Sequence, residues 1–206
     1  IHERNVNIDI ILLLLKNALK LNPKLKLILM SATMPKDIFQ NYYKEFGIEE
    51  IKIEGKSNFP VDIKYPLKID KIKPRDLVGK TFDFFNSILT TDLRDKKSIL
   101  IFMPVNKKIF DLSELMKNKY PHFKIFEISR STAELYSESV DKSIEDLSMD
   151  DGKIYDKKII ISTPVWESSK TIKGLEIVID NGYEWEVSFD AVEIADIRKT
   201  SLISKG

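Results

Sequence analysis

Ile99-Leu100-Ile101-Phe102-Met103 is an unbroken apolar run, and it decides the fold class of the chain. A short run of this kind, bounded by turn residues, is typical of a strand buried on both faces of a parallel sheet. Residues 105–119 then have helical periodicity, and residues 123–128 form a second strand-like run. Strand, helix and strand in this order predict a parallel β-α-β unit.

The alternation continues on both sides of this unit. Helical periodicity recurs at 74–89 and at 135–147, and strand-like apolar runs occur at 158–162 and at 175–180. We therefore expect an α/β domain built on a parallel sheet with helices on both faces.

Two alternating stretches after residue 180 predict a β-hairpin. The first is Gly182–Phe189, the second contains Val192, Ile194 and Ile197, and Asp190-Ala191 lies between them. The alternative is an ordinary extension of the sheet that buries the aromatic side chains. The two tryptophans, Trp166 and Trp185, could stack on bases, but a lone tryptophan is more often part of a core, and we favour the core position.

The first part of the chain predicts a separate, incomplete domain. A helix is expected at 5–21, buried on more than one side, and a second helix from Pro35 to about Phe46. Strands are expected at 25–30 and 51–53 of this domain, and a further strand at 61–69 after it. Polar residues, Gly and Pro cluster at 55–60 and predict a linker. We thus expect a partial first domain at 1–57 and a second domain at 58–206.

Composition excludes several classes of function. The 206 residues include 33 basic and 32 acidic side chains, for a net charge of +1, so any contact with nucleic acid must be a local groove. The absence of cysteine excludes disulfides, cysteine-based zinc sites and thiol catalysis, and two histidines are too few for a histidine-rich metal cluster.

The chain also lacks the features of a membrane or targeting segment. Its longest apolar run, Ile10–Leu15, is far shorter than the roughly 18 residues that span a bilayer. The first residue is isoleucine, not methionine, so we expect an internal piece of a longer polypeptide, with no membrane partner.

Function in a parallel α/β sheet is expected where strands end at their carboxyl edge. Three of the four segments at these ends are rich in serine and threonine, which suits contacts with phosphates or sugar hydroxyls. The alternative is helix capping, because serine and threonine are preferred N-cap residues. The segments are 31–33, 104–107, 129–132 and 162–169.

Several motifs together resemble the DExH/DEAH group of superfamily 2 helicases. His2-Glu3-Arg4 resembles the end of the Walker B motif, and Lys26–Met34 resembles the strand that ends in Ser-Ala-Thr. Ile99–Phe102 is similar to the strand of motif IV, Ile159–Ile172 to motif V and Ile177–Tyr183 to the strand that follows it. Pro164, Trp166 and the short loops are more similar to the viral branch, such as the poxvirus-type NTPase/RNA helicases.

The resemblance implies two RecA-like lobes and an NTP-dependent 3′-to-5′ RNA helicase that uses ATP and Mg²⁺. It implies single-stranded or duplex RNA as partner, with DNA as an alternative, and an intracellular location in the cytoplasm or in a virion if viral. The family's phosphate loop, Asp-Glu pair and arginine motif are absent from this chain, so we expect activity only in the full protein. The competing class is a non-catalytic nucleic-acid-binding scaffold.

The resemblance also implies that the predicted hairpin acts as a wedge at the duplex junction, and it assigns roles to individual residues. The implied catalytic residues are His2, Glu3, Ser31 and Thr33. Of these, His2 couples the nucleotide site to the second lobe, and Ser31 and Thr33 link hydrolysis to strand separation. Nucleic-acid contacts are implied for Ser129, Arg130, Thr163 and Ser168. Nucleotide contacts are implied for Ser169, Thr171 and Asp180. The alternatives are a terminal histidine without a role, strand-end caps, a surface turn at 129–130 and a buried, capped Asp180.

Overall fold

The computed structural model of the chain describes residues 6–31, 36–53, 60–65, 72–164, 171–190 and 194–202. The chain divides into two compact units, Ile1–Ile63 and Lys64–Lys205. The domain boundary predicted after residue 57 falls within 54–59, outside the described residues, and it stays a prediction. In the described residues, no helix has both the length and the apolar character needed to cross a membrane.

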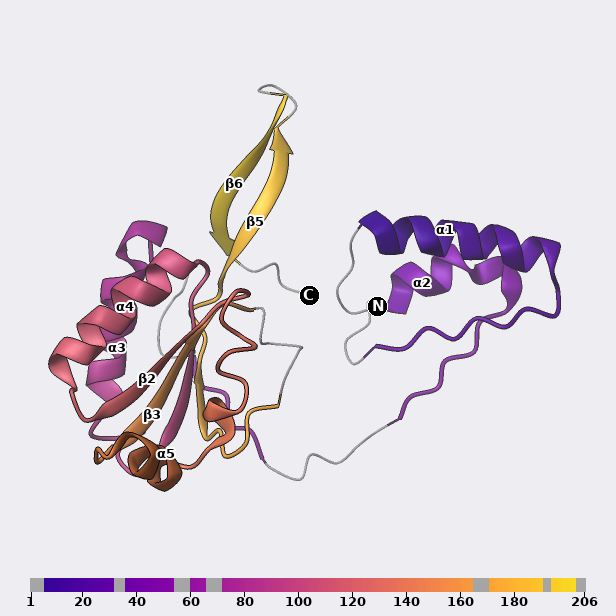
Figure 1. Cartoon of the computed structure of the whole chain (residues 1–206). Helices are drawn as coiled ribbons and strands as arrows, with labels where there is room; N and C mark the ends of the chain where they lie inside the picture. Colours follow the sequence, from indigo (N-terminus) through magenta and orange to yellow (C-terminus); the bar gives the residue numbers. More distant parts are fainter. Residues whose placement is uncertain are drawn as a thin grey trace. The chain divides into compact units, whose positions relative to one another are not determined.

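The second unit contains the parallel sheet that the sequence predicts (Figure 1). Its four strands have the order β2-β3-β1-β4, and all neighbouring pairs are parallel. The strands are β1 (Ser98–Phe102), β2 (Phe123–Ile128), β3 (Lys157–Ser162) and β4 (Ile177–Ile179). The predicted α/β fold class is confirmed, with strand bounds within two residues of those expected.

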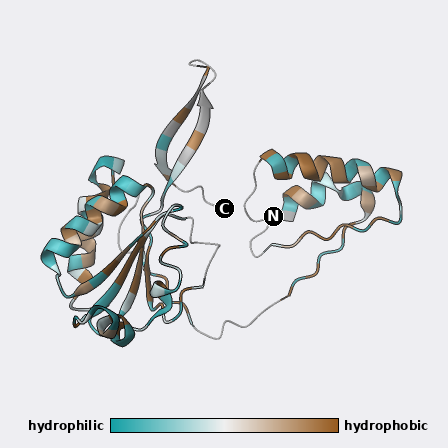
Figure 2. Ribbon diagram, in the orientation of Figure 1, coloured by the Kyte–Doolittle hydropathy of each residue, from teal (hydrophilic) through white to brown (hydrophobic). Residues whose placement is uncertain are grey.

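Helices cover both faces of this sheet. On one face, Ile99 and Ile101 of β1 pack with α3 (Leu77–Ile88), which follows a 3-10 turn at Pro74–Asp76, and with α4 (Asn106–Lys119). On the other face, Leu100 packs in a second cluster with Leu147 of α5 (Ile144–Asp151). Figure 2 shows the strands mainly brown, as expected for strands covered on both sides.

The helix predicted at 135–147 is wrong in its bounds. The structure has turns, a 3-10 segment at Ser139–Asp141 and then α5, which begins at Ile144. Ser143 caps this helix, because its Oγ accepts a hydrogen bond of 3.1 Å from the Asp146 N–H. Val140 and Leu147 share one apolar cluster although they lie in different elements. The helical spacing of these two residues therefore arises from two separate elements and not from one continuous helix.

The predicted hairpin is present as a separate antiparallel pair. It consists of β5 (Tyr183–Asp190) and β6 (Ala195–Leu202), paired from Tyr183 with Leu202 to Asp190 with Ala195. The turn predicted at Asp190-Ala191 is wrong in its first residue, because Asp190 is the last residue of β5 and pairs with Ala195 of β6. Ala191 lies outside the described residues. The hairpin does not extend the four-stranded sheet. Accordingly Trp185 is 47% exposed, and its predicted core position is wrong.

The first unit contains two helices and a small core. These are α1 (Val6–Leu21) and α2 (Lys36–Tyr42), followed by a 3-10 turn at Lys44–Phe46. Leu12, Phe39 and Tyr43 are buried together. The Tyr43 hydroxyl donates a hydrogen bond of 2.8 Å to the Leu12 carbonyl oxygen, so it fixes α1 to the segment after α2.

The strands predicted at 25–30 and 51–53 of the first unit do not form. Residues 61–65, the described part of the strand predicted at 61–69, are not a strand either, and residues 66–69 lie outside the described part. Ile28 is 80% exposed and Ile53 is 90% exposed. A parallel strand needs a hydrogen-bonded neighbour, and the described residues of this unit supply none. Without a sheet to pack against in the described part of the unit, α1 buries one side only. Its predicted burial on more than one side is therefore wrong.

Candidate functional site

Strand register brings the predicted binding segments of the second unit to one edge of the sheet. Ser162, the last residue of β3, is paired with Phe102 of β1 and with Ile128 of β2. The Thr163 N–H donates to the Ile128 carbonyl oxygen at 3.2 Å, and the Met103 N–H donates to the Ser162 carbonyl oxygen at 2.8 Å. The carboxyl ends of β2, β3 and β1 therefore lie side by side.

The loop after β2 is held by its own hydroxyl groups. The Ser129 N–H donates to Thr132 Oγ1 at 2.9 Å, and the Ser129 and Ser131 hydroxyls lie 2.9 Å apart. Thr132 Oγ1 also donates to the Glu127 carbonyl oxygen at 3.0 Å. Ser129 is buried in this network whereas Arg130 is exposed. Of the two predicted residues, Arg130 is thus the one that can reach a ligand.

Thr163 has a hydroxyl that is available for a ligand. The residue is half-buried, and its backbone is fixed on both sides, because its N–H bonds to Ile128 and its carbonyl oxygen accepts from Ser162 Oγ at 2.8 Å. Within the described part of the chain, the Thr163 hydroxyl has no hydrogen-bond partner. A fixed backbone with a free donor suits contact with a phosphate oxygen, and that contact stays a prediction.

The segment after β4 contains one predicted residue and one that sequence reasoning missed. Asp180 is exposed, so the buried alternative is wrong, and its Oδ1 accepts from the Gly182 N–H at 2.8 Å. Asn181 is buried, and its Nδ2 donates to the Phe102 carbonyl oxygen. Its Oδ1 accepts from the Tyr183 N–H at 3.0 Å, so Asn181 joins β4, β1 and the first residue of β5.

The sequence signal for Asn181 is local and weak. Asn181 lies in an Asp-Asn-Gly run, which favours side-chain-to-backbone turns. This signal does not indicate the contact with another strand that the structure gives to Asn181.

The remaining predicted site residues are not brought to this edge by any described contact. Ser31 is half-buried at the end of a described segment of the first unit, and Thr171 is exposed. His2, Glu3, Thr33, Ser168 and Ser169 lie outside the described residues, as does Trp166. In the described ranges, no group of three or more acidic, histidine or cysteine side chains could hold a metal ion.

The sequence of the chain is similar to those of known ATP-dependent RNA helicases. A protein of Acanthamoeba polyphaga mimivirus named as an ATP-dependent RNA helicase (L540) is 31% identical to the chain over 209 residues. The ATP-dependent RNA helicase HrpA of Escherichia coli is 30% identical over 183 residues. The homologues of this chain are DExH/DEAH-type ATP-dependent RNA helicases. No protein-family model matches the chain.

The structure agrees with a helicase fold. The crystal structure of the E. coli DExH-box NTPase HrpB matches 98% of the chain with a TM-score of 0.73 and 23% sequence identity. The chain spans only part of these helicases, with 28% of the mimivirus protein, 13% of HrpA and 23% of the HrpB chain covered.

Proposed function

We propose that the chain is part of an ATP-dependent RNA helicase that couples ATP hydrolysis to 3′-to-5′ translocation and duplex unwinding. The observation that carries this proposal is the match to the mimivirus RNA helicase over 99% of the chain. The arrangement of the second unit supports it, because hydroxyl and amide side chains gather where β1, β2, β3 and β4 end.

In this proposal the carboxyl edge of the second unit contacts the RNA backbone. Thr163 donates to a phosphate, and the exposed Arg130 supplies positive charge beside it. Contacts of this kind recognise phosphates and not bases, so we expect binding that is independent of sequence. Single-stranded RNA is the proposed ligand, with DNA as the alternative substrate.

ATP and Mg²⁺ are proposed as cofactors of the whole protein. The described residues do not fit a metal site, because they contain no suitable group of ligands. We therefore assign no step to the metal on this chain. Thr171 and Asp180, both exposed, are the described residues proposed to approach the nucleotide.

A viral source and an intracellular place of action, in the cytoplasm or in a virion, complete the proposal. The mimivirus relative supports the viral source. The location is consistent with a reaction that consumes ATP and acts on RNA.

The alternative function is a nucleic-acid-binding scaffold without ATPase activity, and one experiment separates the two. ATP hydrolysis by the full-length protein is measured with and without single-stranded RNA. The proposal predicts hydrolysis that RNA stimulates. RNA binding without any hydrolysis would favour the scaffold.

A further inference from the structure

Lys158, the second residue of β3, is a buried ammonium group without a counter-ion. It is 3% exposed, and its Nζ donates to the carbonyl oxygens of Val140 at 2.7 Å and Lys142 at 3.0 Å. It forms no salt bridge with any described residue. Burial lowers the pKa of Lys158, and the more distant Asp141 carboxylate opposes this shift. An ammonium group has three donors, so one N–H remains for another acceptor.

Ser98 is the neighbour of Lys158 on the adjacent strand and is also unsatisfied. The two residues are paired in the register of β1 and β3, so their side chains project from the same face of the sheet. Ser98 is 4% exposed, and its Oγ has no hydrogen-bond partner among the described residues. Buried polar groups are normally paired. The Ser98 hydroxyl and the third N–H of the Lys158 ammonium group are therefore two adjacent buried donors without an acceptor in the described part of the chain.

Both side chains line one cavity of about 420 Å³ at the amino edge of the sheet, the edge opposite to Thr163. The first turn of α5, with Ile144 and Glu145, and the segment Lys173-Gly174 line it as well. A helix N-terminus favours negative charge. The cavity thus brings together two buried donors and the positive end of a helix.

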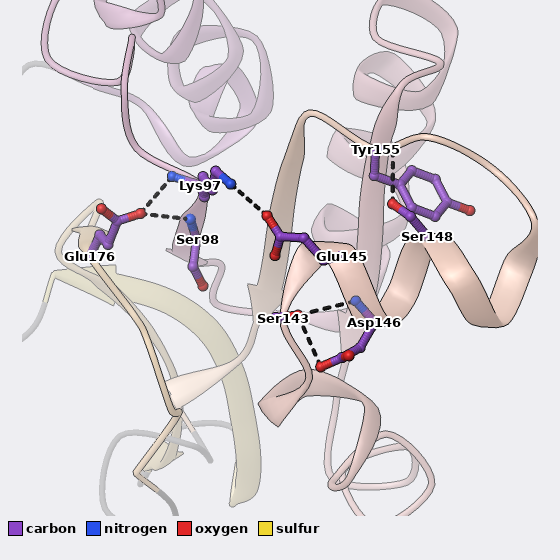
Figure 3. Close-up of polar contacts among 8 residues, drawn as sticks. All are labelled: Lys97, Ser98, Ser143, Glu145, Asp146, Ser148, Tyr155 and Glu176. Carbon is purple, nitrogen blue, oxygen red and sulfur yellow. Dashed lines mark hydrogen bonds and ion pairs between the residues drawn. The ribbon is translucent and has the colours of Figure 1, made fainter.

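Three of the four carboxylates that line this cavity already accept hydrogen bonds. Figure 3 shows Glu176 accepting from the N–H groups of Lys97 and Ser98, at 2.5 and 3.2 Å. Glu145 pairs with the Lys97 ammonium at 2.6 Å, and Asp141 accepts from the Lys173 N–H at 3.2 Å. The Ser98 hydroxyl takes part in none of the drawn contacts, and it has no hydrogen-bond partner among the described residues.

We propose that this cavity binds a small oxyanion, a phosphate or carboxylate group, between Ser98 Oγ, Lys158 Nζ and the first turn of α5. The ligand accepts from the serine hydroxyl and from the free ammonium N–H, and its charge compensates the buried cation. The lining contains four lysines and four carboxylates, so the net charge is near zero and a small anion fits better than a highly charged one.

The test is a titration of the ¹⁵N-labelled chain, followed by NMR. Sodium phosphate and sodium acetate are added in separate arms against sodium chloride of equal ionic strength. We expect saturable shifts of the Ser98, Glu145 and Gly174 amide signals. A response to phosphate alone assigns a tetrahedral ligand, and a response to both assigns any small oxyanion. Without a saturable response in either arm, the cavity holds only water and the proposal is wrong.

Ser98→Ala is the decisive variant, because it removes a hydroxyl without a partner and should fold normally. It is expected to raise the dissociation constant of the anion about tenfold, the effect of one hydrogen bond to a charged group. Ser113→Ala is the matched control, since Ser113 is a buried serine of α4 that donates to Glu127 at 2.6 Å. Equal affinities for the native chain and Ser98→Ala would overturn the assigned site.

Discussion

The side-chain amide of Asn181 donates a hydrogen bond to the main-chain carbonyl oxygen of Phe102. This contact joins the end of β4 to the end of β1, and the other side of the same amide accepts from the Tyr183 N–H. The Tyr183 hydroxyl in turn donates to the Ile72 carbonyl oxygen. The base of the hairpin is therefore fixed to the edge of the sheet where the proposed RNA contacts lie.

Asn181→Ala should destabilise the second unit. The variant leaves the Phe102 carbonyl and the Tyr183 N–H without their partners, so we expect the free energy of unfolding to fall by about 1–3 kcal/mol. Urea denaturation followed by circular dichroism measures this. Asn118→Ala on the exposed side of α4 is the control, with an expected change within about 0.5 kcal/mol. An equally small change in Asn181→Ala would contradict the anchoring role.

The stabilising contribution of the Glu176 carboxylate should be lost in acid. Burial raises the pKa of Glu176, but hydrogen bonds from the Lys97 and Ser98 N–H groups lower it more, so the pKa lies below the ordinary 4.5. Below pH 4.5 the unfolded chain binds the proton more readily than the folded chain, so this contribution is lost as the pH falls through the folded pKa.

Glu176→Gln tests this linkage. The variant should be less stable than the native chain at pH 7, and the difference should disappear as the pH falls below 4.5. Chemical denaturation at a series of pH values measures it. Glu134→Gln, at an exposed position, should match the native chain throughout. A difference for Glu176→Gln that persists unchanged in acid would refute the linkage.

Thr163→Val should weaken RNA binding by the full-length protein. Valine has nearly the same shape but lacks the hydroxyl, so we expect a loss of roughly 1.5–3 kcal/mol, the value of a hydrogen bond to a charged group. Fluorescence anisotropy with unrelated single-stranded RNA sequences measures it, and the loss should be similar for each. Thr91→Val, at an exposed turn, is the control. An unchanged affinity, or a loss with one sequence only, would argue against a phosphate contact.

Ser31→Ala with Thr33→Ala should separate hydrolysis from unwinding in the full-length protein. The motif that these residues resemble links the two steps, so much of the ATPase rate should remain while duplex unwinding falls. Both rates are measured on the same preparation. If the amount of duplex unwound per ATP does not change, the coupling role is wrong.

A shorter hairpin should reduce unwinding and leave RNA-stimulated ATPase activity largely intact. Joining Val187 to Arg198 through Asn-Gly keeps their pairing and removes the outer part of β5 and β6. A control that replaces residues 191–194 by serine keeps the length of the hairpin. Normal unwinding by the shortened variant would show that strand separation occurs elsewhere. A variant that does not fold would show instead that the removed strands are needed for stability.

The parallel sheet was predictable from sequence because its strands are buried on both faces. The run at β2, Phe123–Ile128, was predicted with the same bounds that the structure gives it. The runs at 25–30 and 51–53 have similar composition but no paired neighbour among the described residues. A strand forms only when a neighbouring strand pairs with it through hydrogen bonds, and the sequence of one segment does not show whether such a neighbour exists.

The contacts of the candidate sites were not predictable from sequence for a related reason. Asn181 and Phe102 are separated by 79 positions, and only the strand order brings them together. Ser98 and Lys158 likewise meet through the register of β1 and β3. The hydroxyl-rich strand ends that include Thr163 could be predicted, because parallel strands place their carboxyl ends at one edge.

Strand displacement by the full-length protein shows whether it is a 3′-to-5′ RNA helicase. Two labelled RNA duplexes are compared in the presence of ATP, one with a 3′ single-stranded overhang and one with a 5′ overhang. We expect ATP-dependent displacement of the duplex with the 3′ overhang and little displacement of the other. ATP hydrolysis without displacement of either duplex, or displacement only from the 5′ overhang, would contradict it.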